Sequence, residues 1–474
     1  MNARPSDPAE TADLRALARY VAALHVEKLP ARAVPLAKLA LLNLVGSLAA
    51  GSDARLNPAR AAFLEYLDGF ASAPRVTVPF AGRRSHPQLA ALVSAVTAMA
   101  SHTDDFSPRA RTHASAVLGA VCLAVGEDRH VNGRELLAAF IAGWEIAARL
   151  GDAIRPGLAG PGAEFVSPTH TPAAAAAAAR LAGLDEQGIA HAIGLACDMG
   201  TGLIGQAPSQ TNTLRTPLGA SLGVYCAELA ERGMTASPNA LLAWRRAYGG
   251  DDAAPLDEGI DARCILAEVG FQLKPYQFST GVYGLIGGLQ QARGEHAFTA
   301  DEVEAVDCWI SPGMERVYGV LVPRSQAEAH FSIGLACALA LVRDEWDLVD
   351  VATVPNPDAT IRRLTAAVRL HRLPGSEHLT ALTAASTRVE AAIRLRGGRM
   401  ITVTPAPPPP IVDPERDGAS VRALFRRRAV AALGDDRATR IETTVERIED
   451  VPDVSSLAML LAEPIRSSGR HPPG

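Results

Sequence analysis

The first 270 residues carry the pattern that most limits how this chain can fold, because alanine and leucine recur there at helical spacing. Seven consecutive alanines occupy positions 173–179, and apolar residues return every three or four positions between Thr11 and Gly51. Aromatic residues make up only 5% of a chain that is 48% hydrophobic. Small side chains let helices approach closely, so the sequence predicts a tightly packed helical domain. Further helices are predicted at residues 86–101, 115–126 and 132–151.

The pattern changes beyond Phe271. The stretches VEAVDCWISP and STRVEAAIRLRGGRMITVTP alternate in polarity or are rich in β-branched residues, which predicts strands, and Gly397-Gly398 stands where a hairpin turn would. Helices are expected between these strands at residues 327–342 and 360–370. The proline-rich segment 401–414 predicts a stiff connector, and helical patterns return at 420–433 and 451–461. The break near residue 270 therefore indicates a domain boundary.

Composition excludes several classes of protein. A length of 474 residues indicates two domains, and 46 basic against 51 acidic residues leave no positive excess that would attract nucleic acid. The six cysteines stand singly, so we expect reduced core thiols in the cytoplasm. The N-terminus lacks an apolar signal core, and we expect no stretch of about 18 uninterrupted apolar residues, hence a soluble protein without membrane contact. The sequence shows no zinc spacing, GxGxxG or P-loop, so we predict a site without metal or cofactor.

The segment Ser101–Ser115, SHTDDFSPRARTHAS, concentrates ionisable groups between two predicted helices. It holds two histidines, two aspartates and a Thr-His step, in a stretch that contains proline and has no helical period. Ionisable side chains gathered at such a junction are typical of functional sites. The sequence therefore predicts a site at this loop.

The order of residues in this loop resembles the signature of the MmgE/PrpD family, which includes 2-methylcitrate dehydratase, cis-aconitate decarboxylase and iminodisuccinate epimerase. The resemblance rests on the apolar run AVLGAVCLAVGE and, before it, on His102, Asp105, Phe106, Thr112, His113 and Ser115. It implies a mainly α protein that forms a homodimer, in which an all-helical domain carries an inserted α/β lid. The implied parts are residues 1–269 for the helical domain, 270–412 for the lid and 413–474 for returning helices, with a disordered tail from about residue 466.

The resemblance also implies the residues of the site. The catalytic candidates are Asp105, His113, Lys274 in VGFQLKPYQFSTG and Tyr318 in ERVYGVLVP. A small carboxylate is the expected substrate, and the residues expected to bind it are Thr112, Arg111, Ser115, Gln210, Asn212 and Arg215. The neighbouring Asp104 and His102 are open to two interpretations, as groups that orient the others or as simple surface groups.

Three segments depart from the family pattern. Val166 stands where relatives usually have a histidine, with His170 a few residues later; Asn212 takes the place of a lysine and Arg215 that of a histidine; and Gly281 replaces a histidine of the lid. These are positions that tune proton transfer in relatives. We therefore expect a specialised substrate, for example one with an activated leaving group such as phosphate, in a secondary-metabolite pathway.

Three functions remain open on the sequence. The first is a cofactor-independent lyase that eliminates water or another leaving group from a small carboxylate, with His113 or Asp105 as base. The second is an isomerase or epimerase, which needs a second proton carrier facing His113 across the cleft, either Tyr318 or Lys274. The third is a non-catalytic relative that binds a small acid or a partner, with Asp105 and His113 unable to reach a common point.

Overall fold

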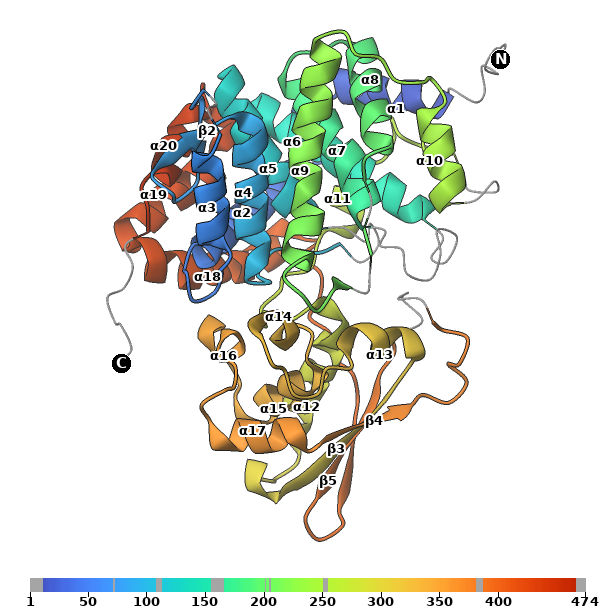
Figure 1. The fold of residues 1–474 in the computed structure, drawn as a ribbon, viewed down its shortest axis with the longest axis vertical. Helices are drawn as coiled ribbons and strands as arrows, with labels where there is room; N and C mark the ends of the chain where they lie inside the picture. The colour runs from blue at the N-terminus through green and yellow to red at the C-terminus, as the bar shows by residue number, and fades with distance from the viewer. Residues whose placement is uncertain are drawn as a thin grey trace.

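A computed structural model describes residues 12–70, 73–107, 113–154, 166–200, 202–203, 206–249, 255–380 and 387–465. These residues form a large helical domain and a smaller α/β lid beneath it (Figure 1). A mainly α fold with a second α/β part agrees with the sequence prediction. The substrate-binding candidates Arg111 and Thr112, and the predicted disordered tail, lie outside the described residues.

The helical domain is built around α7, Val166–Leu181, which contains the seven alanines, all of them buried. It packs against α6, Gly133–Ala153, and α9, Asn212–Glu231. A Cβ atom on Gly223 of α9 would lie 2.4 Å from the Cβ atom of Ala174, so only glycine permits this approach of the two helices. The predicted close packing is confirmed. The other elements are α1 Ala12–Ala23, α2 Ala33–Gly51, α3 Arg60–Asp68, α4 Pro87–Ala100, α5 Ala114–Arg129, α8 Glu186–Cys197, α10 Ala240–Tyr248, α11 Ile265–Val269, and the hairpin β1 Val76–Val78 and β2 Arg83–Ser85.

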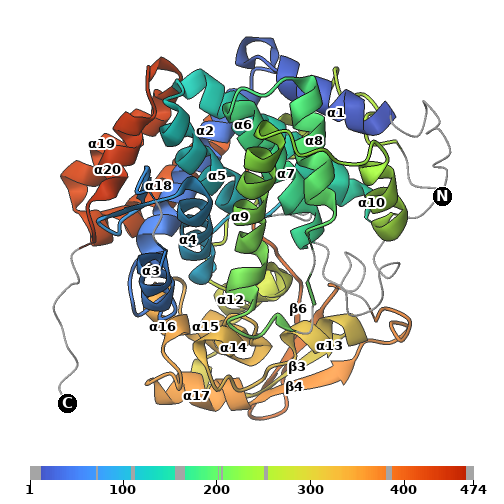
Figure 2. The same cartoon turned by 45° about the horizontal axis from the view of Figure 1, so that its top comes forward.

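The C-terminal helices pack against the N-terminal helices of the same domain. The helix α18, Pro414–Leu433, packs along α2, so a late helix and an early helix of the chain lie side by side (Figures 1 and 2). It is followed by α19, Asp435–Glu446, and α20, Ser455–Ala462. The sequence analysis did not predict α19. The only buried residues of this helix are Ala438, Ile441 and Val445, an apolar pattern too sparse to indicate a helix without its tertiary partners.

The helix α2 requires a correction. By length and composition it could cross a membrane, since its mean hydropathy is 1.7 over the apolar window, whereas the sequence analysis expected no such stretch. Within the fold, 83% of that window is buried. It packs against α4, α5, α6 and α18. A helix that is apolar on all sides is explained here by burial in the centre of the helical domain.

The lid is a four-stranded sheet covered on one face by helices. The strand order is β4-β3-β5-β6, with β4 parallel and β5 antiparallel to the central β3. The helices α12, α15 and α17 enclose the lid core against this sheet. The elements are α12 Tyr283–Glu295, β3 Val303–Ile310, α13 Pro312–Tyr318, α14 Gln326–Ala329, α15 Ile333–Val342, α16 Leu348–Ala352, α17 Ala359–Ala366, β4 Val368–Arg372, β5 Glu390–Leu395 and β6 Met400–Val403.

Two helices predicted in the lid differ from the structure. The helix expected at 360–370 ends at Ala366, and residues 368–370 belong to β4, because Val368 and Leu370 pair with β3 and face the lid core. The helix expected at 327–342 is divided into α14 and α15. The hairpin turn predicted at Gly397-Gly398 is confirmed, since both residues adopt positive φ between β5 and β6.

Two connections join the lid to the helical domain. Phe271 in the first and Ile411 in the second pair through their backbones, with N···O distances of 3.2 and 2.7 Å. Gln272, in turn, pairs with Phe106 of the loop that follows α4, at 3.0 and 2.7 Å. The loop that the sequence analysis singled out is therefore part of the junction, and the predicted boundaries at 269/270 and 412/413 fall within these connections.

Candidate active site

A cavity of about 480 Å³ lies at the junction of the helical domain and the lid. This volume is within the range of roughly 300–1,000 Å³ that is typical of small-molecule sites. The helical domain contributes the loop after α4 and the first turns of α5 and α9, and the lid contributes residues 279–285, the end of α13 and the Pro405–Pro407 segment. Three of the four predicted catalytic residues line it, namely His113, Lys274 and Tyr318.

The backbone pairing of the junction determines which aspartate meets Lys274. Phe106 and Gln272 are antiparallel partners, so the residue two before Phe106 lies opposite the residue two after Gln272. These residues are Asp104 and Lys274. The Nζ atom of Lys274 lies 2.8 Å from Oδ1 of Asp104, and both side chains are almost fully buried.

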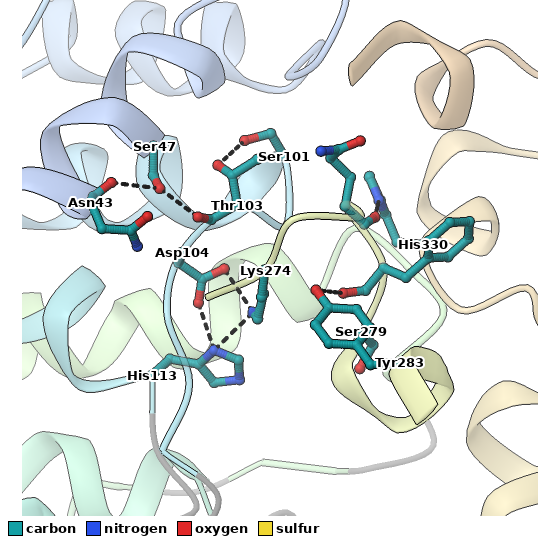
Figure 3. Close-up of polar contacts among 12 residues, drawn as sticks. Asn43, Ser47, Ser101, Thr103, Asp104, His113, Lys274, Ser279, Tyr283 and His330 are labelled. Carbon is teal, nitrogen blue, oxygen red and sulfur yellow. Dashed lines mark hydrogen bonds and ion pairs between the residues drawn. The ribbon is translucent and has the colours of Figure 1, made fainter. Parts of the chain in front are cut away.

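His113 completes what we call the Lys-Asp-His cluster, made of Lys274, Asp104 and His113 (Figure 3). Its Nδ1 atom lies 2.6 Å from Oδ2 of Asp104 and 3.1 Å from Nζ of Lys274. An ionised carboxylate only accepts hydrogen bonds, so this short contact requires the proton of the neutral ring to be on Nδ1. The lone pair of His113 is then on Nε2, on the side of the ring away from Asp104.

Within and around the cluster, burial and neighbouring charges decide which groups are ionised. Burial raises the pKa of Asp104, but Lys274 and His113 outweigh this effect and hold the pKa well below its usual range. Burial lowers the pKa of His102 and His170 well below the usual value, and that of His330 to about 4. These three histidines are therefore neutral near pH 7, and the buried Asp104 stays ionised beside Lys274.

Asp105 does not occupy the place that the sequence analysis gave it. Its side chain is fully buried away from the cavity wall, where it accepts a hydrogen bond from the hydroxyl of Ser115. Successive residues of an extended loop point in opposite directions, so when Asp104 faces Lys274, Asp105 faces the interior of the helical domain. Ser115, a predicted substrate-binding residue, is buried with it and does not line the cavity.

Asp105 should make the stability of the protein depend on pH. Burial raises its pKa from 3.8 to about 7, so the folded protein binds a proton more tightly than the unfolded chain does. The stabilising contribution of protonated Asp105 is complete below about pH 4 and is lost as the pH rises through about 7. We expect Asp105→Asn to be more stable than wild type by roughly 2–4 kcal/mol at pH 8 and much less so at pH 5. Urea denaturation at both pH values measures this difference, and an advantage independent of pH would contradict it.

Of the three remaining predicted substrate-binding residues, two line the cavity and one does not. Asn212 and Arg215, in the first turn of α9, line the cavity, and the guanidinium of Arg215 donates to Oδ1 of Asn212 at 2.9 Å. Gln210 is exposed and does not line the cavity. Its backbone carbonyl accepts from Thr213, so its role is to begin α9.

Two departures from the family pattern have a structural explanation. A Cβ atom on Gly281 would lie 2.5 Å from the ring of Tyr318, and the Gly281 N–H donates to the Tyr318 hydroxyl at 3.2 Å. Tyr318 thus occupies space that a side chain at position 281 would need. Val166 lines the cavity, whereas His170 lies one turn later in α7 and accepts, through Nε2, the backbone N–H of His113 at 3.1 Å.

Arg428 of α18 joins the two backbone segments that carry Asp104 and Lys274. Its guanidinium donates to the carbonyl oxygen of Thr103 at 2.8 Å, to that of Lys274 at 2.9 Å and to Oδ1 of Asn43 at 3.1 Å. Ser47 lies 2.8 Å from the same Thr103 oxygen (Figure 3). The sequence analysis missed Arg428, because a buried arginine in a basic helix far along the chain gives no local signal.

The fold and site define a class of protein: a mainly α protein with a second α/β part, and between them a cavity lined by a buried lysine, a buried aspartate and a partly exposed histidine. Residues 15–253 match the MmgE/PrpD N-terminal domain, and the chain belongs to the MmgE/PrpD family, as the resemblance predicted. The cis-aconitate decarboxylase-like protein oryM of Aspergillus oryzae is 27% identical over 249 residues. That match covers 49% of each chain, so it spans about half the length of the curated relative. Dehydratase- and decarboxylase-like chemistry on small carboxylates is the activity that this family suggests.

Metal ligands do not gather in the part of the chain that the structure describes. No group of three or more His, Cys, Asp or Glu residues there could hold a metal ion.

Proposed function

We propose that the protein is a cofactor-independent lyase that removes the proton next to a carboxylate and eliminates water or another leaving group. The observation that supports this most directly is the 2.6 Å contact between Nδ1 of His113 and ionised Asp104. It presents the basic Nε2 atom of His113 at the cavity, with the ring held in one tautomer.

The proposed reaction uses residues from both parts of the chain. The substrate carboxylate lies between Lys274 and Arg215, whose positive charges stabilise the enolate-like charge that develops when Nε2 of His113 takes the α-proton. The electron pair of the C–H bond forms the new double bond as the bond to the β-oxygen breaks. Phosphate departs with the electron pair of the broken C–O bond and needs no proton, whereas hydroxide must be protonated to leave as water, and the phenol of Tyr318 is our candidate for that proton.

The state of Tyr318 agrees with this role. Burial raises its pKa, so the phenol keeps its proton near neutral pH. Its oxygen lies 2.8 Å from the hydroxyl of Ser279 and accepts from the Gly281 N–H. The phenol is thereby fixed on the lid side of the cavity, where its proton is available to a leaving group.

An isomerase or epimerase is the second candidate, and it depends on Tyr318. The reaction needs two proton carriers on opposite faces of the substrate. Lys274 is not the opposing carrier, since it contacts the same Asp104 as His113 does. Tyr318 comes from the lid and lines the same cavity, so it is the group that would return the proton to the other face.

Proton exchange in D2O, followed by NMR, distinguishes the three functions. Wild type and His113→Gln are compared on a panel of small hydroxy-, phospho- and amino-carboxylates. We expect loss of the leaving group with wild type alone. Deuterium at the α-carbon without elimination would favour the isomerase, and no exchange on any compound would favour a relative that only binds its ligand.

The family resemblance adds two further proposals. We propose a homodimer, and the exposed Leu214, Leu218 and Tyr225 on α9 are apolar side chains that a second copy could cover. A cytoplasmic location is likewise proposed from the six cysteines, which are all free.

A further inference from the structure

The lid side of the cavity is built mainly of apolar side chains. We call this surface the apolar wall; its residues are Leu285, Val317, Phe331, Val389, Pro405 and Pro407. They come from five separate segments of the lid, so the wall is a product of the fold and not of one apolar stretch. A substrate made only of carboxylates and hydroxyls would leave these carbons without a suitable partner.

Polar groups on the lid side largely bond to one another. The hydroxyls of Ser279 and Tyr318 lie 2.8 Å apart, and Tyr318 also accepts from the Gly281 N–H. Arg388 donates to Glu390 at 2.6 Å. The Lys-Asp-His cluster, with Arg215 and Asn212, lies on the helical-domain side and in the first connection. The cavity is therefore amphipathic: the Lys-Asp-His cluster and Arg215 lie on one side, and the apolar wall lies on the other, where Arg388 is the charged residue among the described lining residues.

The volume of the cavity also favours a substrate that has an apolar part. The cavity volume of about 480 Å³ exceeds the roughly 300 Å³ at the lower end of the range for small-molecule sites. A four-carbon diacid needs only a fraction of this space. The part next to the apolar wall is left for a further group of the substrate.

We infer that the natural ligand is a carboxylic acid with an apolar substituent of several carbons, alkyl or aryl, whose acid group lies at the Lys-Asp-His cluster and whose substituent lies on the apolar wall. This inference rests on the proposed function, since it takes the cluster as the place of the carboxylate. It extends that function by naming the substrate class. Relatives that act on small acids would differ in the lid residues that form the wall.

Binding of 2-alkylsuccinates tests the inference. The probes are succinate and its 2-methyl, 2-butyl and 2-hexyl derivatives, titrated calorimetrically into the full-length protein at fixed pH and salt. We expect the Kd to fall about three- to fourfold for each added methylene, the gain typical of a CH₂ group leaving water. A Kd independent of chain length overturns the inference. Hexylamine should not bind, because it lacks the carboxylate, and binding as tight as that of 2-hexylsuccinate would also overturn it.

Two matched variants test whether the gain in affinity per methylene depends on the apolar wall. Val317→Thr keeps the shape of a wall residue but adds a hydroxyl, so it should reduce the gain per methylene. Val306→Thr makes the same change in the lid core, at a buried residue that does not line the cavity, and should leave the gain unchanged. Equal effects of the two variants would show that lid stability, and not the wall, sets the affinity.

The outcomes also distinguish this inference from the proposed function. Tight, chain-dependent binding without α-proton exchange on any acid would refute the lyase and retain the ligand class. Turnover of unsubstituted acids without any dependence on chain length would retain the lyase and refute the ligand class.

Discussion

Replacement of His113 by glutamine should lower kcat/KM by about 10² to 10⁴-fold, the usual contribution of a general base. Glutamine fills similar space and can still donate to Asp104, but it offers no basic nitrogen to the substrate. The fold should be unaffected, since the side chain of His113 is about 20% exposed at the cavity. Steady-state kinetics on the substrate identified by proton exchange measures the loss.

His378 provides the control for this variant. It is an exposed histidine of the lid that does not line the cavity. His378→Gln should retain wild-type kinetics. If His113→Gln also retained them, His113 would not be the base, and the Lys-Asp-His cluster would have to be interpreted as structural.

Removal of one member of the Lys274–Asp104 pair should destabilise the protein by about 3–5 kcal/mol, because it leaves the other charge buried without its partner. Lys274 and Asp104 are 1% and 2% exposed, and their atoms are 2.8 Å apart. The double variant Lys274→Met, Asp104→Asn should recover much of that loss, since both charges are then absent. Urea denaturation at pH 7 gives the four free energies of unfolding that complete the cycle.

An exposed ion pair is the control for the cycle. Arg324 and Glu328 lie 2.7 Å apart, but the arginine is 85% exposed. Arg324→Met should leave the midpoint of unfolding almost unchanged, because water replaces the lost contact. Strictly additive losses for Lys274→Met and Asp104→Asn would contradict the coupling of the buried pair.

Local sequence patterns were sufficient for much of the fold. The helix predicted at residues 132–151 is present as α6, and the side chain of Asn132 caps it by accepting from the backbone N–H of Glu135 at 3.0 Å. The alanine run, the hairpin at Gly397-Gly398 and the loop at 101–115 were likewise found from residues close together in sequence. The strand β4 was missed, since Val368 and Leu370 are fixed by pairing with β3 and not by their neighbours.

The candidate site was predictable only in part, for the same reason. His113 and Lys274 follow from residue order within family-like segments. The choice between Asp104 and Asp105 depends on the pairing of Phe106 with Gln272, which joins residues 166 positions apart. The roles of Arg428 and His170 also arise from contacts across the fold, so no window of sequence could indicate them.

The position of Arg428 has a consequence for protein synthesis. A ribosome delivers the loop at 101–115 and the lysine at 274 long before it delivers α18. Until then, the carbonyl groups of Thr103 and Lys274 lack the guanidinium that joins them. A message truncated before codon 428 would therefore yield a polypeptide that contains Asp104, His113 and Lys274 but lacks the guanidinium that joins the backbone of their two segments.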